Sequence, residues 1–263
     1  LKVADEVMAC GDVMLEAGTP LIKSCGLEAV RALRKRFPSA VIVADMKVMD
    51  TGRMEAEIAF KAGASIVTVM GNASDGTIRE AVRAAENYGG RVLADLMEEA
   101  ATVQRAKAVE DLGCHIIGTH IPIDEQMAGN ISFSFLREVA GAVSVPVAVA
   151  GGIHPGNAAQ AVEAGATILI VGGAVTKSAD ATAALKDILR AVSTGKPVAT
   201  RFYQRVSLDG VRDALSRVST ANVSDALHRR GWVSGIVPVV PGARAVGPAV
   251  TVRTYPDDWA KPV

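Results

Sequence analysis

Three charged residues in the pattern Asp-x-Lys-x-x-Asp are the most specific chemical signal in the sequence. Asp45 and Lys47 end an apolar run that reads as a buried strand, and Asp50 follows on the loop just past it. Because side chains alternate between the two faces of a strand, Asp45 and Lys47 are predicted to share one face. Such a pair could stabilise negative charge that develops on a bound substrate. The plainer alternative is a structural salt bridge inside the fold.

Carboxylates and a histidine stand at or near the ends of three other apolar runs: Glu16, Asp95 and His120. Two close carboxylates, Glu16 and Asp45, favour a cation between them, and oxygen ligands suit Mg²⁺, with Mn²⁺ as the alternative. Glu16 by itself could equally be an anion at a helix N-terminus. A histidine is largely neutral near pH 7, so His120 could take or give a proton, unless it only makes structural hydrogen bonds. His115 begins the same run and is predicted to be structural.

Two glycine pairs follow the last two runs of this kind. They are Gly151–Gly152 and Gly172–Gly173. In barrels of eight parallel strands, the turns after strands seven and eight commonly bind phosphate through backbone N–H groups. Either pair alone is consistent with a tight turn, but both at these places predict a phosphate site.

Strand-like and helical segments alternate along most of the chain and must position these residues. We predict strands at residues 13–16, 41–47, 65–70, 91–96, 115–120, 145–150 and 168–171. We predict helices at residues 27–37, 54–62, 77–88, 100–111, 133–143, 156–164 and 181–192. This alternation indicates βαβ units and a parallel sheet, that is, an α/β fold.

A recurring glycine favours a closed barrel over an open sheet. Gly63, Gly113 and Gly165 each separate a helix end from a buried strand, about every two βα units. We therefore predict a (β/α)8 TIM barrel with its chemistry at the carboxyl ends of the strands. The chain begins inside a helical pattern, so we expect the first of the eight strands to be missing from it. A doubly wound open sheet is the alternative.

Composition argues against several classes of partner. The 28 basic and 28 acidic residues cancel, so nothing indicates binding to nucleic acid or a membrane surface. The longest apolar runs are too short to span a bilayer. The three cysteines are scattered, odd in number and without C-x-x-C spacing, which is typical of a reducing compartment. We predict a cytoplasmic protein.

The alternation stops near residue 193. We predict a barrel domain at residues 1–195, a linker at 196–206, and the beginning of a second α/β domain at 207–263. We expect both ends of the sequence to be cut from a longer protein.

Residues 1–192 resemble the hexulose-6-phosphate synthase and 3-keto-gulonate-6-phosphate decarboxylase group of the orotidine-monophosphate-decarboxylase superfamily. The matching segments are residues 16–23, 44–52, 60–64, 118–126 and the two Gly-Gly turns. The Asp-x-Lys-x-x-Asp segment is the most specific of them.

This resemblance implies a role for each candidate residue. Glu16 and Asp45 would hold Mg²⁺, and Lys47 would stabilise developing negative charge. Asp50 would reach the neighbouring subunit's site in a homodimer with shared active sites. His120 would act as acid and base with Asp95 close by. The backbone amides that would hold the substrate phosphate are those of Gly151, Gly152, Gly172 and Gly173.

The implied reaction is fixation of formaldehyde on a sugar phosphate. Removing a proton next to the ketone of ribulose 5-phosphate gives an enediolate, which attacks formaldehyde to give hexulose 6-phosphate. A metal and a lysine stabilise the charge where it forms. The decarboxylase makes a similar enediolate by losing CO₂, so the shared residues leave both reactions open. Asp124 and Gln126 match the loop of the synthase branch.

The end of the chain resembles the start of the RraA-like family, through residues 221–227 and 241–252. That family includes metal-dependent aldolases and a regulator of ribonuclease activity. A third hypothesis is therefore a regulatory or scaffold protein that acts through this domain and carries an inert barrel. The intact set of Asp45, Lys47, Asp50 and His120 argues against an inert barrel.

Overall fold

The computed structural model describes residues 1–11, 13–97, 102–121, 131–200, 208–231, 240 and 245–248. The chain divides into two compact units, Leu1–Tyr203 and Gln204–Val263. None of the described helices is both long enough and apolar enough to cross a bilayer.

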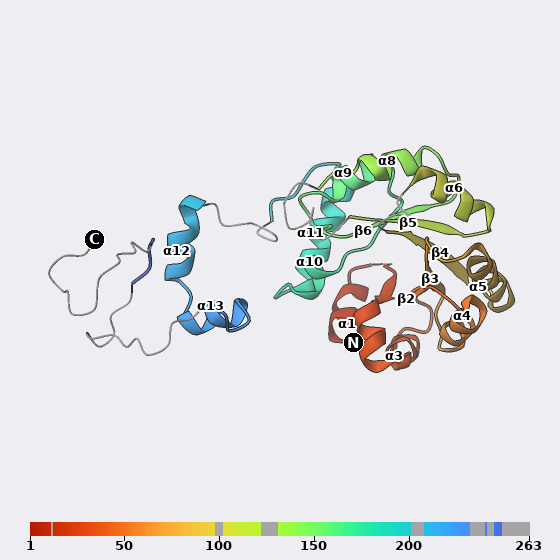
Figure 1. The fold of residues 1–263 in the computed structure, drawn as a ribbon, viewed down its shortest axis with the longest axis horizontal. Coiled ribbons are helices and arrows are strands. Elements are labelled where there is room, and N and C mark those ends of the chain that lie inside the picture. Colours follow the sequence, from red (N-terminus) through yellow and green to blue (C-terminus); the bar gives the residue numbers. More distant parts are fainter. Residues whose placement is uncertain are drawn as a thin grey trace, which may run out of the picture. The chain divides into compact units, whose positions relative to one another are not determined.

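The first unit is built on a curled sheet of seven parallel strands (Figure 1). The strands are β1 (Leu15–Ala17), β2 (Ile42–Val48), β3 (Ile66–Met70), β4 (Arg91–Leu96), β5 (Ile116–His120), β6 (Val147–Ala150) and β7 (Ile168–Leu169). Each strand pairs with the next one along the chain. A doubly wound sheet reverses its strand order at a switch point, so this sequential order is TIM-barrel-like instead.

Helices cover the outside of this sheet (Figure 1). They are α1 (Lys2–Met8), α2 (Thr19–Cys25), α3 (Glu28–Arg36), α4 (Gly52–Lys61), α5 (Asp75–Tyr88), α6 (Val103–Asp111), α8 (Ser134–Ala140), α9 (Ala158–Glu163), α10 (Gly173–Thr176) and α11 (Ala181–Thr194). The first and last of them are in contact, because the Thr182 hydroxyl donates to the Glu6 carbonyl at 3.1 Å. The helical layer therefore continues from α11 to α1, as in a ring.

Alternation along the strands separates two apolar layers. The larger one lies under the helices and includes Ile42, Val67, Val92 and Ile117. The smaller one lies inside the curl and consists of Val43, Ile66, Leu93, Ile116 and Ala148, with Ile168 and Ile170 against it. Two residues further along the strands, the inward positions are Asp45, Thr68, Asp95 and Gly118. The inner apolar layer is thus the floor on which the polar residues stand.

The second unit contains a 3₁₀ turn at Leu208–Gly210, α12 (Val211–Ser216) and α13 (Thr220–Ala226). Ser219 caps α13 in a reciprocal capping box with Asn222. The strand-like residues 249–253 lie outside the described residues.

Candidate active site

A pocket of about 270 Å³ opens at the carboxyl ends of the strands. Its lining comes from the strands and from the turns that directly follow them. Nine of the ten predicted site residues line it: Glu16, Asp45, Lys47, Asp95, His120, Gly151, Gly152, Gly172 and Gly173. These residues are spread over more than 150 positions of the sequence, so the parallel sheet is what brings them together.

Asp50 is the predicted residue that stands apart from this pocket lining. It is exposed on the loop after β2, and its Oδ1 accepts the backbone N–H of Thr51 at 2.7 Å. Asp124 and Gln126, on the loop predicted to distinguish the synthase branch, lie outside the described residues.

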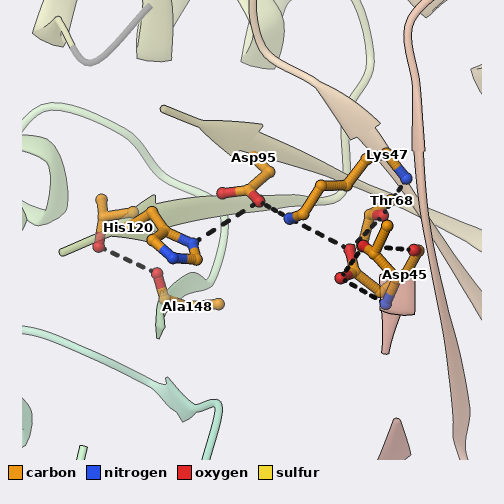
Figure 2. Close-up of polar contacts among 8 residues, drawn as sticks. Asp45, Lys47, Thr68, Asp95, His120 and Ala148 are labelled. Atoms are coloured by element: carbon orange, nitrogen blue, oxygen red, sulfur yellow. Dashed lines mark hydrogen bonds and ion pairs between the residues drawn. The ribbon is translucent and has the colours of Figure 1, made fainter. Parts of the chain in front are cut away.

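Lys47 stands between two carboxylates (Figure 2). Its Nζ lies 3.3 Å from Asp45 Oδ1 and donates a hydrogen bond to Asp95 Oδ2. Burial lowers the pKa of Lys47, but the charge and hydrogen bond of Asp95, together with Asp45, outweigh burial and raise it. The lysine is therefore a fixed positive charge in the pocket.

Strand β2 reaches this arrangement through an irregularity. Its pairing with β3 shifts register between Ala44 and Val48, and Lys47 adopts a left-handed backbone with φ of 48°. The Lys47 N–H donates to the side-chain hydroxyl of Thr68 at 3.0 Å. Asp45 and Lys47 both line the pocket: Asp45 follows the alternation of the strand, whereas Lys47 lies in the bulge.

The Asp45 carboxylate is held by neighbouring threonines. Its Oδ2 accepts the Thr19 N–H at 3.2 Å and the Thr19 hydroxyl at 2.5 Å. Its Oδ1 accepts the Thr68 hydroxyl at 2.8 Å. Burial alone would raise the pKa of Asp45, but the Thr19 hydrogen bond, the Lys47 charge and the Thr68 hydrogen bond together lower it. Asp45 is thus held in its ionised form.

His120 faces the other side of Asp95 (Figure 2). Its Nδ1 lies 3.9 Å from Asp95 Oδ2, too far for a hydrogen bond, and this buried nitrogen finds no partner in the described part of the chain. Burial lowers the pKa of His120, and the opposing charge of Asp95 offsets only part of that effect. The imidazole is therefore neutral near pH 7 and able to take up a proton. His115 instead accepts the Val92 N–H at 3.2 Å, which fits a structural role.

Glu16 is the middle residue of β1 and lines the same pocket as His120. The residue is exposed to solvent, although protein atoms surround part of its carboxylate. That partial burial, followed by the negative charge of Asp45, raises the pKa of Glu16 to about 7. Within the described ranges, no group of three or more Asp, Glu, His or Cys residues could hold a metal.

The two glycine turns form the remaining wall. Gly151 and Gly152 have φ of 93° and 66°, a left-handed conformation that favours glycine. The backbone N–H groups of all four turn glycines find no acceptor among the described residues. Asn157 braces the first turn, because its Nδ2 donates to the Gly152 carbonyl at 3.0 Å and its Oδ1 accepts the His154 N–H at 2.8 Å. Free amides in a rigid turn are suited to an anion.

The sequence reasoning did not single out Thr19, Thr68 or Asn157. Thr68 carried a signal, since it is polar at an inward position of an apolar strand. Thr19 and Asn157 do not stand out in the sequence in this way.

Comparison with known proteins agrees with this geometry. Residues 1–188 match the Orotidine 5'-phosphate decarboxylase / HUMPS family. The chain belongs to this family. Among its curated members, the 3-hexulose-6-phosphate synthase of Methylomonas aminofaciens is 43% identical over 189 residues, which are 72% of this chain and 90% of that protein.

Solved structures give the same picture. A crystal structure of 3-hexulose-6-phosphate synthase has a TM-score of 0.69 and 39% identity, covering 73% of this chain and 92% of that one. The crystal structure of 3-keto-L-gulonate-6-phosphate decarboxylase from Vibrio cholerae O1 biovar El Tor has a TM-score of 0.65 and 27% identity, covering 74% and 92%.

Proposed function

We propose that this chain is a 3-hexulose-6-phosphate synthase, a lyase that joins formaldehyde to D-ribulose 5-phosphate. The observation that carries the proposal is a pocket in which Lys47 links Asp45 to Asp95, with neutral His120 beside them. The 43% identity to a protein of that name supports the same reaction. The ribulose monophosphate pathway is where such an activity would operate.

The phosphate of the substrate would bind at the two glycine turns. Their N–H groups line the same pocket as Asp45 and Lys47, which come from β2, and find no acceptor among the described residues. A phosphate held there by Gly151, Gly152, Gly172 and Gly173 would leave the sugar chain extended over the charged side chains of the pocket. Binding energy from the phosphate would thus orient the carbon atoms that react.

Glu16 and Asp45 would hold Mg²⁺, with Mn²⁺ as the alternative. A carboxylate offers about four acceptor sites, and three on Asp45 are filled by Thr19 and Thr68. The fourth faces Lys47 Nζ, 3.3 Å from Oδ1, so a metal would take this site from the ammonium. The negative charge of Asp45 also helps to raise the pKa of Glu16, and a cation between the two would relieve that repulsion. Two carboxylates are enough for Mg²⁺, which takes its other ligands from water and substrate. When bound, the metal supplies positive charge that stabilises an enediolate.

The protein's own groups would carry out the proton transfers. Neutral His120 would take the proton from C1 of ribulose 5-phosphate, and the electron pair would move to the C2 oxygen to give the 1,2-enediolate. The Lys47 ammonium, held by Asp95, stabilises that negative charge. C1 then attacks the carbon of formaldehyde, whose oxygen takes up a proton to complete hexulose 6-phosphate.

A homodimer would complete the site through Asp50. This residue is exposed on the loop after β2. Nearby in the sequence, Met49, Met54 and Ile58 are exposed as well, with 51%, 69% and 48% of each residue accessible. A second copy that covers this apolar stripe would bring Asp50 to the pocket of its partner. Exposed apolar side chains in one place are typical of an interface.

The decarboxylase is the second candidate reaction, because a solved 3-keto-L-gulonate-6-phosphate decarboxylase shares the fold at 27% identity. An assay with Mg²⁺ separates the two. Formaldehyde loss that needs ribulose 5-phosphate would support the synthase. CO₂ release from 3-keto-gulonate 6-phosphate without formaldehyde loss would replace it with the decarboxylase, and silence in both would favour a regulatory role.

We also propose that residues 207–263 begin an RraA-like domain after a linker at 196–206. The division of the chain at Tyr203 and the capped helix α13 support a separate unit. A cytoplasmic location is proposed as well, since Cys10, Cys25 and Cys114 are all free thiols.

A further inference from the structure

Thr68 lies on β3 between the strands that carry Asp45 and Asp95, and only 3% of it is exposed. It lines the active-site pocket, although its hydroxyl has no evident chemistry of its own. Its Oγ1 accepts the backbone N–H of Lys47 at 3.0 Å and donates to Asp45 Oδ1 at 2.8 Å. One buried hydroxyl therefore touches both of the charged residues that the proposed reaction needs.

The direction of these two hydrogen bonds is fixed. A backbone N–H can only donate and an ionised carboxylate can only accept, so the single hydroxyl hydrogen must point to Asp45. The register shift in β2 takes the Lys47 N–H out of the regular ladder, and Thr68 supplies the acceptor that the ladder would have given. The bulge thereby orients the hydroxyl, and the hydroxyl orients the carboxylate.

Thr19 completes the arrangement from the opposite side. Its N–H and hydroxyl both bind Asp45 Oδ2, so the two oxygens of the carboxylate are held by different threonines on different elements. Rotation of the carboxylate about its Cβ–Cγ bond would break bonds on both sides at once. The fourth acceptor site, which Lys47 Nζ faces at 3.3 Å and which a metal would take over, is consequently held in one direction.

We propose that Thr68 is a positioning residue whose hydroxyl fixes the Asp45 carboxylate in the orientation that binds the divalent metal. This inference rests on the proposed metal site. Groups that orient metal ligands typically change metal affinity about 10–100-fold when they are removed.

The test is direct Mn²⁺ titration of the full chain, without substrate, followed by electron paramagnetic resonance of free Mn²⁺. Two matched pairs isolate the hydroxyl: Thr68→Val against the wild type, and Thr68→Ala against Thr68→Ser. Thr119→Val is the control, because Thr119 is equally buried at 3% but donates to the backbone carbonyl of Ala148.

We expect Thr68→Val to bind Mn²⁺ about 10–100-fold more weakly, with Thr68→Ser close to the wild type and Thr68→Ala weakened like the valine variant. Thr119→Val should keep the wild-type affinity. Equal affinities within both pairs, or an equal loss in Thr119→Val, would overturn the inference. If Thr68→Val fails to fold, the Ser and Ala pair decides. A wild-type chain that binds no Mn²⁺ would overturn the metal site itself, which is a separate outcome.

Discussion

Replacing Lys47 by methionine should have opposite effects on metal binding and on turnover. Lys47 Nζ lies 3.3 Å from Asp45 Oδ1, beside the acceptor site that a metal would use. Two unit charges about 4 Å apart interact with about 1 kcal/mol in water, and with more inside a protein. For a divalent cation this repulsion is about 2 kcal/mol or more, so we expect Mn²⁺ to bind Lys47→Met at least about 10-fold more tightly.

Turnover should fall in the same variant, because the ammonium that stabilises the enediolate is gone. Loss of one preorganised charge-stabilising group typically lowers kcat about 100–1000-fold. Stability should fall as well, since Asp45 and Asp95 lose the cation between them. Breaking a buried ion pair costs about 3–5 kcal/mol, and because a quarter of the Lys47 side chain is exposed, we expect about 2–3 kcal/mol.

Three measurements on Lys47→Met check this reasoning: Mn²⁺ titration, steady-state turnover, and thermal unfolding with and without Mn²⁺. The metal should raise the unfolding temperature more in the variant than in the wild type. Lys186→Met, at an exposed position on α11, is the control and should leave all three unchanged. Weaker or unchanged Mn²⁺ binding by Lys47→Met would refute the placement of the metal beside Asp45.

Further predictions concern the acid–base residue, the phosphate turn and the subunit contact. Because burial lowers the pKa of His120 below its usual 6.5, kcat/KM should stay high until the pH falls through that lowered value. His120→Gln should lose this acidic fall in the pH profile and about 100–10,000-fold in kcat. A fall in the wild-type profile centred above pH 6.5 would contradict the assignment. Asn157→Ala removes the hydrogen bond to the Gly152 carbonyl, so KM for ribulose 5-phosphate should rise about 10-fold with little change in kcat. A fall in kcat alone would contradict phosphate binding at this glycine turn. Ile58→Glu should convert a dimer into inactive monomers in sedimentation experiments, and a monomeric, active wild type would exclude the shared site.

The order of strands and helices could be predicted because each strand is a short apolar run bounded by a helix with its own period. Polar residues at the ends of those runs could then be assigned to one site, since parallel strands present their carboxyl ends at the same edge. Asp45, Asp95 and His120 follow from this rule alone.

Short elements were harder to predict. Helix α2 was missed because Gly18 and Pro20 read as a loop, whereas the proline sits in the first turn of a seven-residue helix. Helix α10 is only four residues long and begins at Gly173, which was interpreted as a turn. Strand β7 is two residues shorter than predicted, because residues 170 and 171 already lead into the pocket turn.

The supporting hydrogen bonds could not be predicted from the pattern. Thr19 and Asp45 are 26 residues apart, and Thr68 is 23 residues beyond Asp45. A neutral hydroxyl has no charge or spacing rule that identifies its partner, so its role becomes visible only when the strands are aligned. The bulge at Lys47 could not be predicted either, because the Lys47 N–H is satisfied by a side chain on the next strand.

The central claim is that this pocket removes a proton from C1 of ribulose 5-phosphate before formaldehyde is present. The most direct measurement follows that proton by NMR in D₂O, with enzyme, Mg²⁺ and ribulose 5-phosphate alone. The account predicts that deuterium enters C1, and that His120→Gln slows this exchange by the same factor as turnover. Full formaldehyde fixation by the wild type with no exchange at C1, or undiminished exchange in His120→Gln, would contradict it.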